Sequence, residues 1–175
     1  ARTSGEGQLT LSFDFLLTKP SSRSDAILSA LAGQHVHAHD LDRGESYSLS
    51  GAYGLTDNIT LSVSLPFVRR VAIREGEHSH SGGVAVNSVI ERGTVQGFGD
   101  SAISAKWRFT GERHHGWEAT VVGGLKLPTG STSEFDQLGE LFETEHQPGS
   151  GSWDPIVGVA LTRPLPSGSV NASLV

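Results

Sequence analysis

Apolar residues alternate with small polar ones in several stretches of the sequence, and this alternation constrains the fold more than any other feature. In residues 59–67 every second position is apolar, and Thr60, Ser62 and Ser64 lie between them. Residues 8–18 and 47–55 follow nearly the same pattern. A period of two places successive side chains on opposite faces of a β-strand, whereas an amphipathic helix needs a period of about 3.6 residues. The chain is therefore predicted to be all-β.

About seven strands are expected, at residues 8–18, 47–55, 59–67, 99–109, 117–127, 153–162 and 169–175. Thr56-Asp57-Asn58 predicts a tight antiparallel hairpin that keeps the apolar residues of both strands on one face. In the next hairpin, pairing Phe109 with Trp117 is expected to set the register. That register gives two cross-strand ion pairs on the polar face, namely Arg108 with Glu118 and Asp100 with Lys126.

Long and short connections alternate along the chain, so long loops gather at one end of the sheet and short turns at the other. The long connections are residues 19–46, 68–98 and 128–152. Strands of about 9–11 residues with this asymmetry are typical of an antiparallel transmembrane β-barrel. Short helices are expected in the extracellular loops, at residues 24–33 and 135–142. Aromatic residues near the strand ends, such as Tyr47 and Phe67, match interfacial girdles.

A soluble β-sandwich is the main alternative fold, because any half-buried sheet alternates in this way. The polar face here carries mainly Ser, Thr and Gly rather than the Lys and Glu of a soluble surface. Small hydroxyl side chains suit an enclosed lumen. Candidate lumen-facing residues are the charged side chains of that face: Asp14, Asp100, Lys106, Arg108, Glu118 and Lys126. Lys106 stands outside the two predicted ion pairs and is the best candidate to contact a solute.

Composition excludes several classes of function. The chain has 175 residues, enough for a single domain over residues 1–175, and a net charge of −6 that argues against a nucleic-acid partner. It has no cysteine, which excludes thiolate metal sites and cysteine nucleophiles. The serines do not form the Gly-x-Ser-x-Gly motif of a hydrolase, and no other catalytic constellation is present. The chain is therefore not expected to be an enzyme.

Several motifs together resemble the outer-membrane β-barrel transporter-like family named for the meta-pathway of phenol degradation. They are YGLTDNITL at residues 53–61, LPF at 65–67, GFGDS at 97–101, KWRF at 106–109, GLKLPTG at 124–130 and GSGSWDP at 149–155. The resemblance implies a barrel of about twelve strands in the outer membrane of a Gram-negative bacterium. It also implies transport of small hydrophobic or aromatic solutes. With about seven strands visible, the chain is expected to be truncated at its C-terminus.

Histidines in the long loops are candidate metal ligands. His35, His37 and His39 alternate beside Asp40, and His78 and His80 repeat the spacing in the next long loop. Imidazole with carboxylate suits Zn or Cu, and both loops lie at the same end, so one ion is expected to be shared. The alternative function is thus a non-transporting surface or scaffold barrel with metal-binding loops.

The remaining partners follow from charge in the loops. Carboxylates in residues 129–152 offer oxygen ligands for a Ca ion. Arg69, Arg70 and Arg74 follow the loop-end Phe67 and are candidates to bind phosphates of lipopolysaccharide in the outer membrane. A homo-oligomer or a surface complex is compatible with the same loops.

Overall fold

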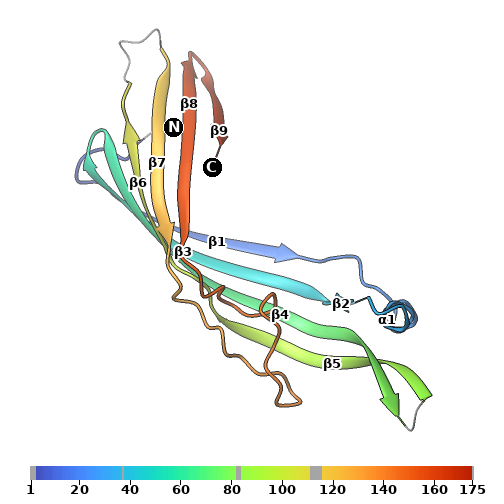
Figure 1. Ribbon diagram of the computed structural model, residues 1–175. Helices are drawn as coiled ribbons and strands as arrows, with labels where there is room; N and C mark the ends of the chain where they lie inside the picture. The colour runs from blue at the N-terminus through green and yellow to red at the C-terminus, as the bar shows by residue number, and fades with distance from the viewer. Residues whose placement is uncertain (1–2, 37, 82–83, 111–115, 175) are drawn as a thin grey trace.

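The computed structural model describes residues 3–36, 38–81, 84–110 and 116–174. They form one antiparallel sheet and one short helix (Figure 1), in the order β1 (Leu9–Thr18), α1 (Asp25–Gly33), β2 (His39–Asp40), β3 (Arg43–Thr56), β4 (Ile59–Ser81), β5 (Val84–Phe98), β6 (Ala102–Arg108), β7 (Glu118–Lys126), β8 (Asp154–Leu165) and β9 (Gly168–Leu174). Strands β1, β3, β4, β6, β7, β8 and β9 pair in that order, and β2 and β5 both pair with β4. The sheet curls into a half-barrel, which confirms the all-β antiparallel prediction.

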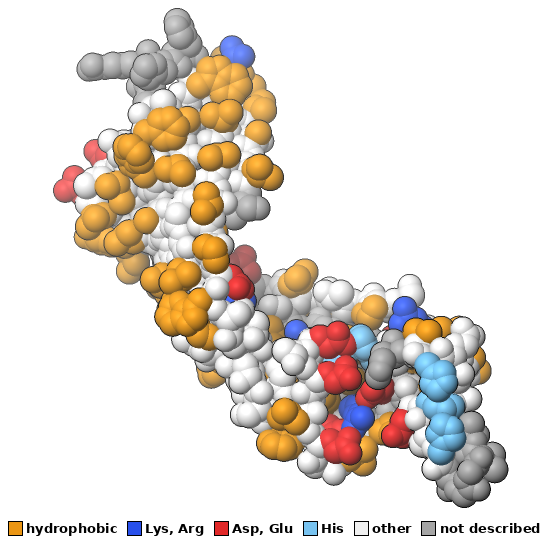
Figure 2. Space-filling view, in the orientation of Figure 1, with side chains coloured by type: hydrophobic (Ala, Val, Ile, Leu, Met, Phe, Trp, Pro, Cys, Tyr) orange, Lys and Arg blue, Asp and Glu red, His pale blue; other side chains and the backbone are white. Residues whose placement is uncertain are grey.

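The two faces of the curled sheet differ in burial. Leu61 and Val63 are 44% and 51% exposed, whereas Thr60 and Thr120, on the opposite face, are 4% and 1% exposed. We call the hydroxyl-rich side the inner face and the apolar side the outer face. Figure 2 shows hydrophobic side chains spread over the half-barrel surface in view. The sheet is thus the reverse of a soluble domain, in which apolar side chains turn inward.

Buried aliphatic and aromatic side chains lie outside the curled part of the sheet. Among the described residues they are Leu28, Ala32, Ala38, Ile73, Val95 and Phe142. The described residues form a single sheet rather than two packed sheets, so they do not make the sandwich that was the alternative. None of the helical segments in the described ranges is long and apolar enough to cross a bilayer.

Residues 68–81 and 84–98 are paired as antiparallel strands, so the prediction of a long loop at residues 68–98 is wrong. Strand β4 continues to Ser81, and β5 returns along it to Phe98. We call residues 68–81 and 84–97 the arm; it extends away from the half-barrel together with α1 and β2 (Figure 1). Within the arm, a bulge near Ala72, whose φ is 55°, interrupts the regular pairing of β4 with β5. The arm escaped prediction because it lacks a continuous apolar face.

One of the two predicted loop helices is present. Helix α1 starts after Ser24, whose side chain accepts a hydrogen bond from the backbone N of Ile27. The prediction of a helix at residues 135–142 is wrong. The side chain of Asp136 accepts hydrogen bonds from the backbone N of Leu138 and Glu140, and Phe135 forms an isolated bridge with Leu141. An Asp that bonds its own backbone in this way stabilises a turn in place of a helix.

The pairing of β6 with β7 differs from the predicted register by two residues. Arg108 lies opposite Thr120 and Ala102 opposite Lys126, so Phe109 does not pair with Trp117. A shift of two keeps every side chain on its face. Both predicted ion pairs therefore still form, but diagonally: Arg108 Nη1 lies 3.6 Å from Glu118 Oε1, and Lys126 Nζ lies 3.6 Å from Asp100 Oδ2.

Aromatic side chains form a row across four neighbouring strands. Phe15, Tyr47, Phe67 and Phe98 are successive partners in the sheet registers of β1, β3, β4 and β5. Their ring centroids are 5.0, 6.4 and 5.5 Å apart in that order. A second group, Trp107 and Phe109, lies toward the short turns, with centroids 5.8 Å apart. Aromatic residues therefore border the apolar outer face at both ends, as the sequence predicts.

Candidate functional site

Three of the sequence motifs meet at Asp100, where the inner face ends. Asp100 Oδ1 accepts a hydrogen bond from Gly130 N at 2.9 Å, and Oδ2 accepts from Ser150 N at 2.8 Å and Ser150 Oγ at 2.6 Å. Lys126 Nζ donates to Ser150 Oγ at 2.6 Å and pairs with Asp154. Asp100 thus holds both ends of the connection between β7 and β8. We call this connection, residues 127–153, the rim loop.

Glycines allow the rim loop to lie directly on the inner face. A Cβ at Gly130 would lie 2.6 Å from the Cα of Gly149, closer than real Cβ contacts. A Cβ at Gly97 would lie 3.0 Å from the Cγ of Pro148. Gly97 lies on the same face as Pro66 and Val68 of β4. The rim loop therefore folds inward across the inner face instead of extending away from it.

Arg92 of β5 anchors the middle of the rim loop to the arm. Its Nη1 lies 3.0 Å from Asp136 Oδ2 and also contacts Glu140, and its Nε lies 2.9 Å from Glu75 Oε2. Burial raises the pKa of Asp136, but the hydrogen bonds from Glu140 N and from Arg92 outweigh it, so the pKa lies below its ordinary value. These two loop carboxylates, which were candidates for a Ca ion, are thus paired with a guanidinium.

A cavity of about 760 Å³ lies between the rim loop and the inner face. We call it the mouth pocket. Its lining includes the cations Arg70 and Lys126 and the carboxylates of Asp100, Glu143 and Glu145. Arg70 is fixed by its Nη1, which donates to the carbonyl oxygens of His146 and Gln147 at 3.0 and 3.2 Å. The pocket therefore combines both signs of charge at the end of the hydroxyl-lined inner face.

The structure places the candidate lumen residues on or beside the inner face. Asp14 lies on β1 opposite Ser48, on the edge strand, and is exposed. Lys106 lies on β6 between Thr60 and Val122. Lys106 lies outside the two ion pairs, as expected, but it has an interaction of its own within the protein. The other four form the two diagonal ion pairs: Asp100, Arg108, Glu118 and Lys126.

The candidate histidine ligands separate into two groups. The rings of His35 and His78 have centroids 4.5 Å apart, and those of His78 and His80 4.9 Å, so the two connections do meet in the arm. His39 lies apart from them, with its Nδ1 3.0 Å from Glu145 Oε1. His37 lies outside the described residues.

The second group includes His146, which sequence reasoning missed. Its ring packs edge-on against that of His39, with centroids 4.8 Å apart, and only 6% of the residue is exposed. Burial, together with the charges of His39 and Arg70, lowers the pKa of His146. A single His in an acidic loop carries no spacing signal, so only the fold reveals this neighbour of His39.

The arginines considered for lipopolysaccharide have partners within the chain. Arg74 Nη1 lies 2.5 Å from Asp25 Oδ1, and its Nη2 lies 2.8 Å from Asp40 Oδ2. Arg69 Nη1 lies 3.6 Å from Glu45 Oε2. These side chains tie α1, β2 and β3 to β4.

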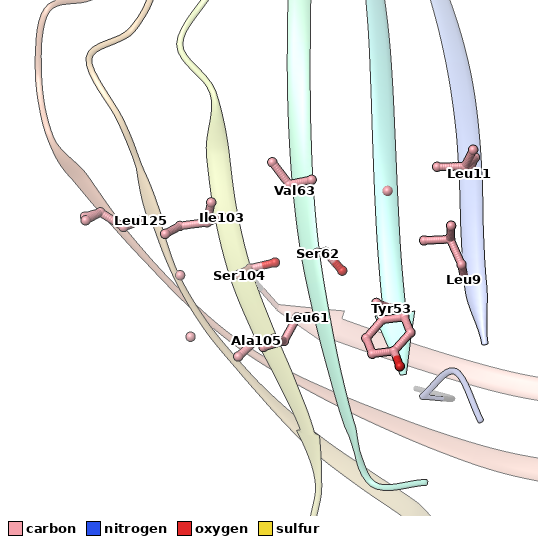
Figure 3. Close-up of a pocket in the computed structure, with 13 residues that line it drawn as sticks. Leu9, Leu11, Tyr53, Leu61, Ser62, Val63, Ile103, Ser104, Ala105 and Leu125 are labelled. Atoms are coloured by element: carbon pink, nitrogen blue, oxygen red, sulfur yellow. The ribbon is translucent and has the colours of Figure 1, made fainter. Parts of the chain in front are cut away.

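The outer face has an open groove of about 680 Å³ (Figure 3). Gly51, Ala105 and Gly123 lack large side chains and leave room between Leu9, Leu11 and the other apolar residues that line it. A Cβ at Gly123 would have no neighbour within 4 Å. The lining is almost entirely apolar, in contrast to the mouth pocket.

Comparison of the chain with models of protein families, with curated proteins and with solved structures finds no match. The curled sheet, the rim loop and the sequence motifs are therefore the basis of the function proposed below.

Proposed function

We propose that this chain forms the wall of an outer-membrane β-barrel that passes small, mostly hydrophobic or aromatic solutes, as its family resemblance implies. The observation that carries the proposal is the reversed sheet. Leu9, Leu61 and Val63 are 64%, 44% and 51% exposed, while Thr120 on the inner face is 1% exposed. An apolar surface of this extent is costly in water and favourable against lipid tails.

The aromatic rows support a membrane position. Trp107 lies opposite Ile59 and Phe67 lies at the other end of the apolar stretch of β4. At about 3.3 Å per residue, residues 59–67 span roughly 26 Å of strand. A tilt of about 40° reduces this to roughly 20 Å, close to the apolar band of about 25 Å in outer-membrane barrels. Lipid tails would then cover the outer face between the rows.

The rim loop supports a solute pathway along the inner face. The rim loop lies across that face, where Gly97 of β5 and the loop residue Gly130 allow close approach. It encloses the mouth pocket between itself and β4. An inward-folded loop narrows an otherwise wide lumen, and its charged lining selects what enters. The hydroxyl side chains along the rest of the inner face offer weak contacts to a solute, which suit passage rather than tight binding.

The membrane position is tested by nitroxide labels at four neighbouring positions, because the chain has no cysteine of its own. The substitutions are Leu61→Cys, Ser62→Cys, Val63→Cys and Ser64→Cys in the full-length protein in lipid vesicles. Labels at 61 and 63 should be accessible to oxygen dissolved in the bilayer, and labels at 62 and 64 should not. Equal access of a water-soluble relaxation agent to all four positions would contradict the proposal.

Transport is tested by the swelling of vesicles that contain the full-length protein. We expect aromatic acids and alcohols to enter faster than in protein-free vesicles. Deletion of residues 132–147 should widen the mouth and raise the flux of larger sugars. Flux equal to that of empty vesicles for every solute, from protein whose labels pass the bilayer test, would leave a membrane protein that does not transport.

A further inference from the structure

We propose that His39, Glu145 and His146 form a binding site for a divalent transition-metal ion of the Zn²⁺ type. The candidate ligand atoms of these three side chains all lie within 4.8 Å of one another. The described residues contain no second group of three potential ligands at this spacing. The site goes beyond the proposed transport function and does not depend on it.

The ligand set fits the chemistry of the ion. Two imidazoles and one carboxylate are a common zinc-binding set, and they leave a fourth position for water. Bonds of about 2.0–2.2 Å in a tetrahedron separate ligand atoms by roughly 3.3–3.6 Å. The spacings here, from 3.0 Å between His39 and Glu145 up to 4.8 Å, bracket that value. Closing the site requires the more distant ligand atoms to move together, and the side chains of Glu145 and His39 are exposed enough to make that movement.

The surroundings hold one ligand firmly and leave the other two free to adjust. The His146 ring lies 6.4 Å from that of Phe142, and its carbonyl oxygen accepts a hydrogen bond from Arg70. The side chains of His39 and Glu145 are 38% and 54% exposed. Glu143 adds negative charge beside the cluster, and the guanidinium of Arg70 opposes it. A partly fixed, partly open ligand set of this kind takes up an ion from solution.

The site joins parts of the chain that lie far apart in the sequence. His39 belongs to β2, which pairs with β4 in the arm, whereas Glu145 and His146 belong to the rim loop. Glu145 also lines the mouth pocket. A bound ion would therefore tie the rim loop to the arm and fix one wall of the mouth pocket.

The histidine group predicted from spacing fits an ion less well. His35, His78 and His80 form two edge-on ring pairs, and the Nδ1 of His78 already lies 2.6 Å from Asn87 Oδ1. None of the three belongs to the three-ligand group. These residues serve as the matched control for the proposed site.

Calorimetric titration of the full-length protein with Zn²⁺ tests the site. We expect one bound ion, with affinity reduced roughly tenfold or more in His39→Ala and in Glu145→Gln. The exposed Glu145 change keeps the test valid if a change at His146 disturbs folding. The His35→Ala/His80→Ala variant should bind like the unaltered protein. Unchanged binding in both His39→Ala and Glu145→Gln, or loss of binding in His35→Ala/His80→Ala, would overturn the proposal.

Hydrogen exchange gives a second readout that does not depend on transport. Zn²⁺ should slow exchange of the amides in residues 143–147, and Ca²⁺ at the same concentration should not. In Glu145→Gln the Zn²⁺ effect should disappear. Protection by Ca²⁺ equal to that by Zn²⁺ would show a carboxylate site in place of the imidazole site and would overturn the proposal. A protein that transports nothing but shows this pattern would keep the metal site and lose only the proposed function.

Discussion

Gly130 and Gly149 lie in backbone contact at the base of the rim loop, so close that a Cβ on Gly149 would fall 2.6 Å from the carbonyl carbon of Gly130. Asp100 bonds to Gly130 N and to Ser150 N on either side of this contact. The two ends of the rim loop are thus closed together on one carboxylate. The rim loop can lie over the inner face because neither Gly130 nor Gly149 has a side chain.

We therefore expect Gly149→Ala to displace the rim loop. The added methyl group would force the two strands of the loop base apart and lengthen the hydrogen bonds to Asp100. Overpacking of this kind costs about 1–3 kcal/mol in a packed site. Denaturant unfolding in detergent should show the loss, and hydrogen exchange should quicken in residues 130–150.

Gly123→Ala is the matched control. A Cβ at Gly123 meets no atom within 4 Å, and the glycine lies within strand β7, where alanine is favoured over glycine. This variant should be as stable as the unaltered protein or slightly more stable. If both variants lost the same free energy of unfolding, close contact at Gly149 would not explain the effect.

The sequence predicts the half-barrel well because its alternation has a physical cause that acts locally. The hairpin predicted at residues 56–58, for example, is present, and a turn at Asp57 and Asn58 joins β3 to β4. The faces are also predictable, since a period of two assigns each side chain to one side whatever the exact register. The ion pair of Arg108 with Glu118 and that of Lys126 with Asp100 are therefore predicted correctly, although the predicted register is wrong by two residues.

The arm and the rim loop were not predictable in the same way. The strands in residues 68–98 carry many Arg, Glu and His residues. Their sequence therefore shows no regular hydrophobic period and resembles that of a loop. Phe135, Leu138 and Leu141 have helical spacing, but the bonds that the Asp136 side chain makes to its own backbone prevent a helix. Local competition of this kind is invisible to a count of apolar positions.

The candidate sites show the same division. Asp100, Lys126 and the glycine motifs are each visible in the sequence, but the meeting of the motifs at Asp100 depends on how the rim loop folds back. His39 was a candidate ligand, and its partners Glu145 and His146 are brought to it by the pairing of β2 with β4 and by the rim loop. Contacts between such distant segments follow from topology, not from spacing.

The register of β6 and β7 can be tested by disulfide formation. Ala105 lies directly opposite Gly123 in the structure, whereas the register expected from Phe109 and Trp117 places Ala105 opposite Val121. Directly opposed Cα atoms lie about 4.5–5.5 Å apart, within disulfide range, and diagonal ones lie farther apart. We expect Ala105→Cys/Gly123→Cys to oxidise readily, as seen by gel mobility without reductant. Faster oxidation of Ala105→Cys/Val121→Cys would favour the other register.

Because the ion pair of Arg92 with Asp136 anchors the rim loop, the loop should become more mobile in acid. The pKa of Asp136 lies below its ordinary value despite burial, which raises it, because the hydrogen bonds from Glu140 N and Arg92 outweigh the burial. A lowered carboxyl pKa stabilises the folded loop above the ordinary value of about 3.9. The contribution is lost only as the pH falls below that value through the native pKa.

A nitroxide attached at Leu138→Cys, an exposed position in the rim loop, would report this change. Its spectrum should stay constant from about pH 8 to 5 and become more mobile below about pH 4. Glu75 and Glu140 also face Arg92, so Asp136→Asn should make the step smaller and not remove it. A rise in mobility between pH 7 and 5 would point to histidine and away from this carboxylate.

The diagonal pair of Arg108 and Glu118 should be strongly coupled. Only 9% of the Glu118 side chain is exposed, and its Oε2 is buried with no hydrogen-bond partner among the described residues. Removing the guanidinium in Arg108→Gln leaves a buried carboxylate without its cation, which we expect to cost about 2–3 kcal/mol. In Arg108→Gln/Glu118→Gln both charges are gone, so the part of the loss that comes from the unpaired carboxylate should return, whereas the hydrogen bonds of Arg108 to Asn58 and to the Asp57 carbonyl stay lost. Denaturant unfolding of the two single variants and the double variant measures the coupling. If the two single losses simply added in the double variant, the two side chains would act independently and the diagonal contact would carry no energy.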